Sequence, residues 1–385
     1  MAETKISALA LDPKRYYWLI SLAWGFLPLV FMYGAHRLDM PNFVWFYFLF
    51  IFFVMPAADL LLGEDSYNPP ESEYVRLRDD PYYKWVGRIT ALVPYAAHLT
   101  GAWYLASHEV TALTYFGFSI AAGYGMGLAV NASHEVGHRR SKVDHLYARL
   151  GLIPSLMGHF RIEHNYGHHI EVATPEDSAT ARMGQSYYGF VFQEIPGGYI
   201  RAWRIERDRL IRKGKSPYSL KNEVVLSALY SLVYYSLVIA LFGVAVLPFL
   251  LISALNGNLL LSSANYIEHY GLLRSKLENG KYEACQPRHS WNSNRFLSNL
   301  LILHLERHSD HHANAQRPFQ CLRHYDDVPQ LPAGYLPMFV LSWMPPLWFK
   351  VMDPLVADWA GGDMDKVLIK PSKEEKIRDR WHNPQ

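Results

Sequence analysis

The stretch FVWFYFLFIFFVMPAADLLLG, residues 43–63, decides the fold class because it is apolar over nearly its whole length. About 20 consecutive apolar residues are what an α-helix needs to cross the hydrocarbon core of a bilayer. A short polar turn precedes it, and residues 17–35 before that turn are apolar as well. That run is longer than the apolar core of a secretory signal peptide, and aromatic residues flank it. The first 63 residues therefore predict two membrane-spanning helices.

Similar apolar runs recur along the chain toward the C-terminus. The six predicted spans are 17–35, 43–63, 85–106, 112–132, 224–242 and 246–266. The remaining long segments, 133–222 and 267–385, are charged and rich in histidine. We expect one all-α domain over residues 1–385, an integral-membrane bundle of six transmembrane helices with a cytoplasmic His-rich helical cap.

Composition supports a membrane protein with a charged layer on one face. Half of the residues are apolar and 19% are charged, so the mean hydropathy of −0.06 averages two unlike parts. Cys285 and Cys321 are too few for a disulfide framework or an iron site made of cysteines alone. An apolar piece at 335–352 contains three prolines, which favours an interfacial or re-entrant helix over a seventh span.

The distribution of basic residues indicates how this bundle is oriented in the membrane. The three short connections near His36, Ser107 and Gly243 carry a single basic residue, Arg37. The segment between the fourth and fifth spans is strongly basic at both ends. Its basic residues there are Arg139, Arg140, Lys142, Arg149, Arg207, Arg209, Arg212, Lys213, Lys215 and Lys221. Because cytoplasmic loops carry the excess of lysine and arginine, we expect both termini and the His-rich segments to face the cytoplasm.

Nine of the 18 histidines fall into four short stretches at the predicted cytoplasmic ends of the spans. The stretch LERHSDHH, residues 305–312, spaces its histidines at i, i+3 and i+4, which share one face of a helix. The nine residues are His134, His138, His164, His168, His169, His269, His308, His311 and His312. Neutral imidazole is a common ligand for transition metals. Nine ligands are too many for one ion, so we expect two ions with four or five histidines each.

Adjacent His168 and His169 point about 100° apart on a helix, so each is expected to serve a different metal. Four acidic residues lie next to these histidines in sequence and are candidates to accept hydrogen bonds from the imidazole rings. They are Glu135, Glu163, Glu268 and Asp310. The other nine histidines are expected to be ordinary surface or core residues. These are His36, His98, His108, His145, His159, His289, His304, His324 and His382.

Two other classes of protein use parts of this pattern. The string HEVGH at 134–138 matches the zinc-protease motif, with Glu135 as general base, but that reading leaves seven clustered histidines unused. A histidine-rich metal transporter would place ionisable residues near the middle of several spans, where His98 is the single candidate.

The strings HExxH, EHNxGHH, NYIEHYG and RHSDHH together resemble the integral-membrane non-haem di-iron monooxygenases, and among them most closely the alkane 1-monooxygenases. NYIEHYGL, residues 265–272, is the discriminating string, and ATPEDSATARMG, SWNSN and VMDPLVADWAGGD extend the resemblance over nearly the whole chain. The resemblance implies two iron ions held by the nine histidines, dioxygen as co-substrate, and hydroxylation of the terminal methyl of medium-chain n-alkanes to 1-alkanols. A related enzyme acting on fatty acyl chains, a desaturase or ω-hydroxylase, shares the metals and fold and stays open as an alternative.

An alkane has no polar handle, so the protein must select the terminal carbon by shape. On the second span Trp45, Phe48, Phe52 and Met55 form one helical stripe, and we expect it to line a substrate channel open to the bilayer; ordinary lipid or helix contact is the alternative.

Electrons must come from outside, because the chain has no CxxC pair, no haem-attachment signal and no GxGxxG motif. The resemblance implies rubredoxin as the donor, itself reduced by an NAD(P)H-dependent reductase, and a bacterial cytoplasmic (inner) membrane location. No nucleic-acid partner is expected. Residues 201–215 are basic, and the candidates for rubredoxin docking are Arg201, Arg204, Arg209 and Arg212, with anionic lipid as the alternative partner.

Overall fold

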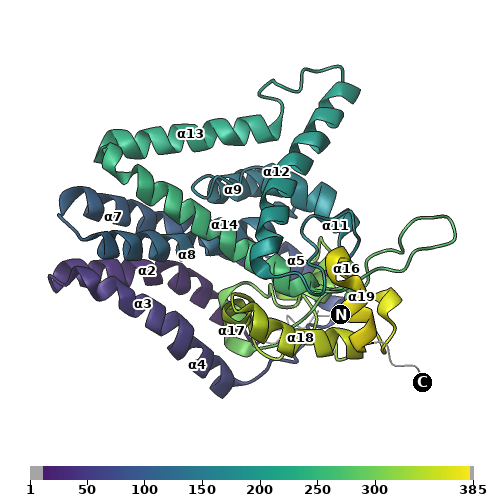
Figure 1. Cartoon of the computed structure of the whole chain (residues 1–385). Coiled ribbons are helices and arrows are strands. Elements are labelled where there is room, and N and C mark those ends of the chain that lie inside the picture. Colours follow the sequence, from purple (N-terminus) through teal and green to yellow (C-terminus); the bar gives the residue numbers. More distant parts are fainter. Residues whose placement is uncertain (1–11, 382–385) are drawn as a thin grey trace, which may run out of the picture.

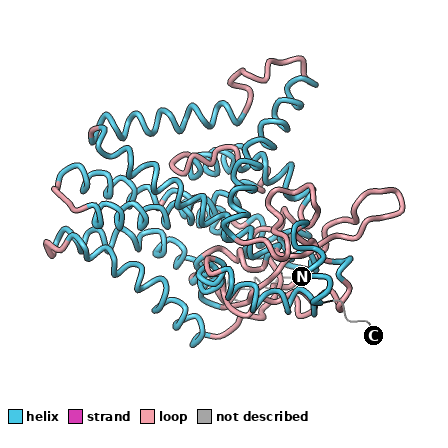
Figure 2. The backbone as a smooth tube through the Cα atoms, in the orientation of Figure 1, coloured by secondary structure: helices cyan, strands magenta, loops and turns pink. Residues whose placement is uncertain are grey.

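The computed structural model describes residues 12–381, and within that range it contains helices and loops but no β-strand, only isolated bridges (Figure 2). This confirms the predicted all-α class. The main helices are α2 Ile20–Arg37, α3 Phe46–Leu49, α4 Met55–Leu62, α5 Tyr74–Asp79, α6 Pro81–Leu92, α7 Pro94–Ser107, α8 Ala112–Gly137, α9 Lys142–Leu152, α10 Phe160–Glu163, α11 His169–Glu171, α12 Tyr187–Arg212, α13 Glu223–Phe242, α14 Leu247–His269, α15 Phe296–Leu301, α16 His308–Ala313, α17 Tyr335–Ser342, α18 Pro345–Trp359 and α19 Glu374–Trp381.

Five stretches of helix in the described part of the chain are long and apolar enough to cross a membrane. They are Tyr17–Arg37, Pro41–Leu62, Ala112–Gly137, Glu223–Phe242 and Val244–His269. The span predicted at 85–106 instead forms two shorter helices, α6 and α7, which meet at Val93. Pro94 causes the break, because proline has no N–H to donate and its ring clashes with the preceding turn. The predicted count of six spans is therefore approximate.

Helix α8 lies at the centre of the bundle, where it contacts α6, α7, α9 and α14 (Figure 1). Of its apolar window 67% is buried inside the protein, against 22% for α13, which lies at the outer edge of the bundle in Figure 1. Small residues explain the close packing of α8 on α14. A Cβ at Gly123 would lie 2.9 Å from the backbone oxygen of Ser253, so only glycine permits this approach.

The C-terminal helices α16 to α19 gather at one end of the bundle and form the cap (Figure 1). The predicted apolar piece at 335–352 becomes α17 and the start of α18, with the break before Pro345, and neither helix is long enough to span a bilayer. A large apolar core joins this cap to the end of α14. It includes Tyr266, Trp291, Trp348 and Met352, all at most 2% exposed.

Candidate metal centre

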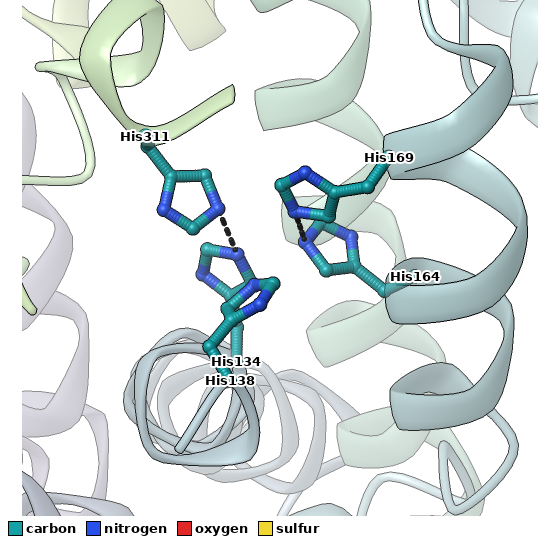
Figure 3. A group of neighbouring side chains, drawn as sticks. All are labelled: His134, His138, His164, His169 and His311. Carbon is teal, nitrogen blue, oxygen red and sulfur yellow. Dashed lines mark hydrogen bonds between the residues drawn. The ribbon is translucent and has the colours of Figure 1, made fainter. Parts of the chain in front are cut away.

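The structure gathers the nine clustered histidines into two groups at the end of the bundle that carries the cap. The first group is His134, His138, His164, His169 and His311, and the second is His168, His269, His308 and His312. Within each group one ring nitrogen per histidine lies within 4.8 Å of the corresponding nitrogens of the others. Figure 3 shows the five rings of the first group pointing toward one another from three separate segments of chain.

Local helix geometry explains how the second histidine cluster divides between the groups. Residues His164–His168 form one turn of π-helix, in which residues five apart lie over one another. His164 and His169 therefore face the same group, and their Nε2 atoms are 2.9 Å apart, whereas His168 turns to the other group. His134 and His138 reach the first group from regular α-helix, where i and i+4 share a face.

The ring nitrogens approach one another closely across segments. The Nε2 atoms of His134 and His311 are 2.9 Å apart, and those of His269 and His308 are 3.2 Å apart. Two nitrogens bound at right angles to one metal, at about 2.1 Å each, lie about 3 Å from each other. The observed separations therefore match a shared ion.

Burial favours the neutral imidazole, the form that binds a metal ion, in most of these rings. It lowers the pKa of His164, His169, His308 and His312 well below the usual histidine value, and the neighbouring histidines lower it further. Several buried ring nitrogens have no hydrogen-bond partner among the described residues, including Nε2 of His168 and both nitrogens of His312. Unpartnered buried nitrogens are costly unless a metal accepts their lone pairs, so the donor set fits two metal ions.

Two rings of the second group are oriented by partners on their outer side. His168 donates Nδ1–H to Asp177 over 2.9 Å, and His269 Nδ1 lies 3.3 Å from the carbonyl oxygen of His289. Each contact fixes the tautomer that leaves the Nε2 lone pair free to face the centre. Burial raises the pKa of Asp177, but His168 and Arg201 hold it below the usual aspartate value, so the carboxylate stays charged.

The four acidic candidates from the sequence behave differently. Among the described residues only Glu268 of the four lies within hydrogen-bonding distance of a histidine ring, with Oε2 at 3.2 Å from His308 Nε2. Glu135 pairs with Arg139, and Glu163 lies 3.6 Å from Arg201. Asp310 accepts hydrogen bonds from Arg323, Tyr325 and Asn314.

Sequence reasoning missed Asp177, although the string ATPEDSATARMG that contains it was part of the family resemblance. The signal was weak because Asp177 lies nine residues from His168, beyond the reach of a helical repeat. The Asp177 carboxylate accepts hydrogen bonds from the Thr180 hydroxyl and from the backbone N–H of Ala179. The loop that contains these contacts brings the carboxylate back to the His168 ring.

Replacing Asp177 by asparagine is expected to weaken metal binding by about 10- to 100-fold, the usual cost of losing a carboxylate that orients a ligating histidine. Competition with a chromophoric chelator measures this on purified protein. Asp208→Asn is the matched control, because Asp208 pairs only with its neighbour Arg207. Unchanged affinity in Asp177→Asn would show that His168 needs no such partner.

An apolar cavity leads from the bundle to the histidines. Along α8 its wall is formed by Tyr124, Gly127, Leu128, Asn131 and finally His134. Ten residues of α-helix separate Tyr124 from His134, which makes this wall roughly 15 Å long. The opposite wall comes from α14, α15 and α17, with residues including Leu260, Leu261, Ala264, Leu301, Ile302, Leu336 and Phe339.

The predicted channel stripe does not line this cavity. The stripe lies one residue out of phase with the buried face of this helix, which is already set at Val44 and Tyr47, before the π-helical turn Phe50–Val54. The fully buried side of this helix is formed by Val44, Tyr47, Ile51, Met55 and Asp59. Of the predicted stripe only Met55 belongs to that side. Trp45 packs on Phe48, and Phe48 and Phe52 contact the ring of Tyr124, behind the cavity wall.

The four arginines on α12 that were predicted to dock rubredoxin differ in their surroundings. Arg201 turns inward, where it lies 2.9 Å from Glu171 and 3.1 Å from Asp177, and Arg209 is paired with Glu206 on its own helix. Arg204 and Arg212 are exposed. Arg201 thus neutralises acidic groups beside the histidines, and its side chain is not free to meet a partner protein.

Most of the histidines expected to be ordinary residues have hydrogen-bonding partners in the protein. His98 is buried between spans, and its ring nitrogens contact Tyr234 and Ser253. His145, His289, His304 and His324 contact backbone or carboxylate groups. His159 and His324 each have a buried Nδ1 without a partner among the described residues. His382 lies outside the described residues.

The architecture and the site define a class: a helical membrane protein that carries a multi-histidine metal centre in its cap. A sequence model of the fatty acid desaturase family matches residues 110–342. The chain is 43% identical over 372 residues to alkane 1-monooxygenase 1 of Alcanivorax borkumensis, covering 96% of this chain and 92% of that protein. It is 43% identical over 365 residues to the alkane 1-monooxygenase of Ectopseudomonas oleovorans, covering 94% and 91%. The hydroxylase component of xylene/toluene monooxygenase from Pseudomonas putida is 32% identical over 63% of each chain.

The matches to the two alkane 1-monooxygenases span nearly the whole chain. The protein belongs to the alkane 1-monooxygenase family.

Proposed function

We propose that this protein hydroxylates the terminal methyl of medium-chain n-alkanes to 1-alkanols, using dioxygen and electrons from rubredoxin. The observation that carries the proposal is an apolar cavity whose inner end is formed by residues of both histidine groups, His134, His164 and His308. The two relatives that match nearly the whole chain are named alkane 1-monooxygenases.

The nine histidines would hold two iron ions, five ligands on one and four on the other. Neutral imidazoles suit iron, and among the described residues no cysteine belongs to either group, so the donors are those of a histidine-ligated site and not of an iron–sulfur cluster. When bound, the two ions would supply the reductive activation of dioxygen that oxidation of an unactivated methyl group requires.

The chain itself positions the substrate. A hydrocarbon advances roughly 1.3 Å per carbon when extended, so a wall of about 15 Å accommodates on the order of ten carbons. The lining between Tyr124 and Leu128 is apolar. It therefore excludes water and has no polar group that could hold a substrate in another position. Only the end of the chain reaches His134, and this geometry selects the terminal carbon.

The cavity favours an alkane over a fatty acyl chain. Its ionisable lining residues are Glu268, Glu306 and the histidines, all on segments that carry metal-site residues. Among the described lining residues, the end near Trp24 and Tyr124 offers no cation for a fatty acid carboxylate. A substrate with a charged end is therefore not expected to enter with its methyl group toward the metals.

We place the cap and both termini on the cytoplasmic side of the bacterial inner membrane, as the excess of basic residues around α9 and α12 supports. Rubredoxin would then reach the centre from the cytoplasm. Arg204 and Arg212 stay candidates for docking because their side chains are exposed, while Arg201 and Arg209 serve internal ion pairs.

Reversing both exposed charges, Arg204→Glu with Arg212→Glu, is expected to raise the apparent KM for rubredoxin about 3- to 10-fold and to reduce its salt dependence. Steady-state kinetics at two ionic strengths measure both effects. Arg37→Glu, at the opposite end of the first span, is the control and should change neither. An unchanged KM in the double variant would place docking elsewhere.

The function is tested with iron-loaded membranes, octane, rubredoxin, its reductase, NADH and labelled dioxygen. The expected product is 1-octanol that contains one labelled oxygen atom. The proposal fails if membranes with a full metal complement form no alcohol from n-alkanes of any length, or if they desaturate an acyl chain instead.

A further inference from the structure

A second, smaller cavity lies between α12, α14 and the segment before α10. It is lined by Glu194 and His159, with Glu163, Tyr199, Asn258 and Ser262 completing most of its wall. Phe160 lines this cavity and the large substrate cavity as well. Polar groups thus meet on the far side of one wall of the proposed active site.

Glu194 stands in the wall between the two cavities. Its carboxyl oxygens accept hydrogen bonds from Ser262 Oγ and from Asn265 Nδ2, the latter over 3.0 Å. Asn265 in turn lines the substrate cavity. Glu194 therefore contacts the small cavity directly and the substrate cavity through one side chain.

The surroundings of Glu194 differ from those of Glu206, the other buried acid of α12. It is 9% exposed, and no lysine or arginine among the described residues lies within ion-pairing distance of it. Burial raises its pKa, although the hydrogen bonds from Ser262 and Asn265 oppose that shift. By contrast Glu206, twelve residues further along α12, is paired with Arg209 and accepts from the backbone of Glu223.

The small cavity also connects Glu194 with groups nearer the surface. Tyr199 on its wall is 37% exposed, and the ring of His159 stacks on Tyr199 at 3.5 Å between centroids. Nδ1 of His159 is buried without a partner among the described residues, and burial lowers its pKa to about 3. The small cavity has room for about one water molecule, and the polar groups on its wall, His159 and Glu194 among them, are suited to hold it.

The proposed reaction needs such a route, and the inference rests on that function. One oxygen atom of dioxygen enters the alcohol as a C–H bond breaks and C–O and O–H bonds form. The other atom leaves as water. Rubredoxin supplies the two electrons that this reduction takes up, and solvent must supply two protons to a centre whose histidines are ligands.

We propose that Glu194 is a proton-transfer residue, which takes protons from water in the small cavity and passes them through the wall at Asn265 to oxygen reduced at the metal centre. Proton transfer by a positioned side chain contributes about 10²- to 10⁴-fold to a rate.

The test is Glu194→Gln, which keeps the shape and the hydrogen bond from Ser262 but cannot release a proton. Per metal-loaded centre, octanol formation is expected to fall about 100-fold. NADH consumed per alcohol should rise as reduced oxygen escapes unproductively, and the solvent deuterium isotope effect should increase. Glu194→Asp, which retains a carboxyl group, should recover part of the rate. Glu206→Gln is the matched control on the same helix and should leave coupling and isotope effect unchanged.

A second readout does not need turnover. The infrared spectrum of the metal-free protein should contain a protonated-carboxyl band that disappears in Glu194→Gln and shifts in deuterium oxide. Wild-type rate, coupling and isotope effect in Glu194→Gln would overturn the proposal, as would a lower rate with unchanged coupling and no lost band. If wild-type membranes form no alcohol, the proposed function fails, and the infrared arm still decides whether Glu194 carries a proton.

Discussion

Replacing His312 by alanine is expected to remove metal from the second group and to abolish alcohol formation, while the protein still inserts into the membrane. His312 is 5% exposed, and both its ring nitrogens are buried without a partner among the described residues. Its ring lies 4.5 Å from that of His308 between centroids. Losing an orienting carboxylate already costs about 10- to 100-fold, so losing a ligand should reduce metal affinity and activity by more than 100-fold. Metal analysis and octanol formation on the same membranes measure both.

The matched control is His324→Ala. His324 lies twelve residues further along the chain, outside both histidine groups, and contacts Asp326. It should keep full metal content and activity. Membrane insertion of His312→Ala should be normal because the apolar spans, and not the cap, determine insertion. A His312→Ala protein with full metal content would contradict the ligand assignment.

Changing the depth of the large cavity should shift the preferred alkane length. Tyr124 closes the end of the α8 wall, and its ring is supported by Phe48 and Phe52. Tyr124→Ala is expected to lengthen the optimum by about two to four carbons, because each carbon advances roughly 1.3 Å. Leu128→Phe, one turn nearer His134, should shorten it and reduce turnover of the longest substrates by about 10-fold or more.

Competition between n-alkanes of different length in one reaction measures this preference without depending on protein yield. Phe53→Ala is the control, because Phe53 lies on the same membrane helix as Phe52 but is 69% exposed on the outer face. If the two cavity variants keep the wild-type length profile, the cavity along α8 is not where the alkane binds.

Much of this fold could be predicted from hydrophobicity alone. The runs at 17–35, 43–63, 112–132, 224–242 and 246–266 all form long apolar helices. The run at 85–106 does not form one helix, because Pro94 interrupts it. Hydropathy averaged over a window does not detect a single proline. Hydropathy predicts which segments enter the membrane better than it predicts where their helices break.

The nine histidines could be found from spacing, and the division of His168 and His169 between two groups follows from the 100° turn between them. The pairing of His164 with His169 could not be predicted, because it depends on a π-helical turn that no sequence pattern indicates. The contact of Asp177 with His168 and the inward orientation of Arg201 could not be predicted for another reason. Both depend on contacts between loops and helices that come together only in the folded chain.

The inward face of the second span could not be predicted from the sequence either. The buried face of this helix is formed by Val44, Tyr47, Ile51 and Met55, whereas Trp45, Phe48 and Phe52 of the predicted stripe lie one residue further on. A one-residue shift of phase is enough to place the aromatic rings behind the cavity wall. Because residues 43–58 are apolar on every face, the sequence pattern does not indicate which face turns inward.

The iron content of the purified, iron-reconstituted protein tests the central claim most directly. Two groups of five and four histidines predict two iron ions per chain, and removal of both by a chelator should leave the helical content unchanged. A saturating content of one iron per chain, or none, would contradict the two-metal centre on which the whole account depends.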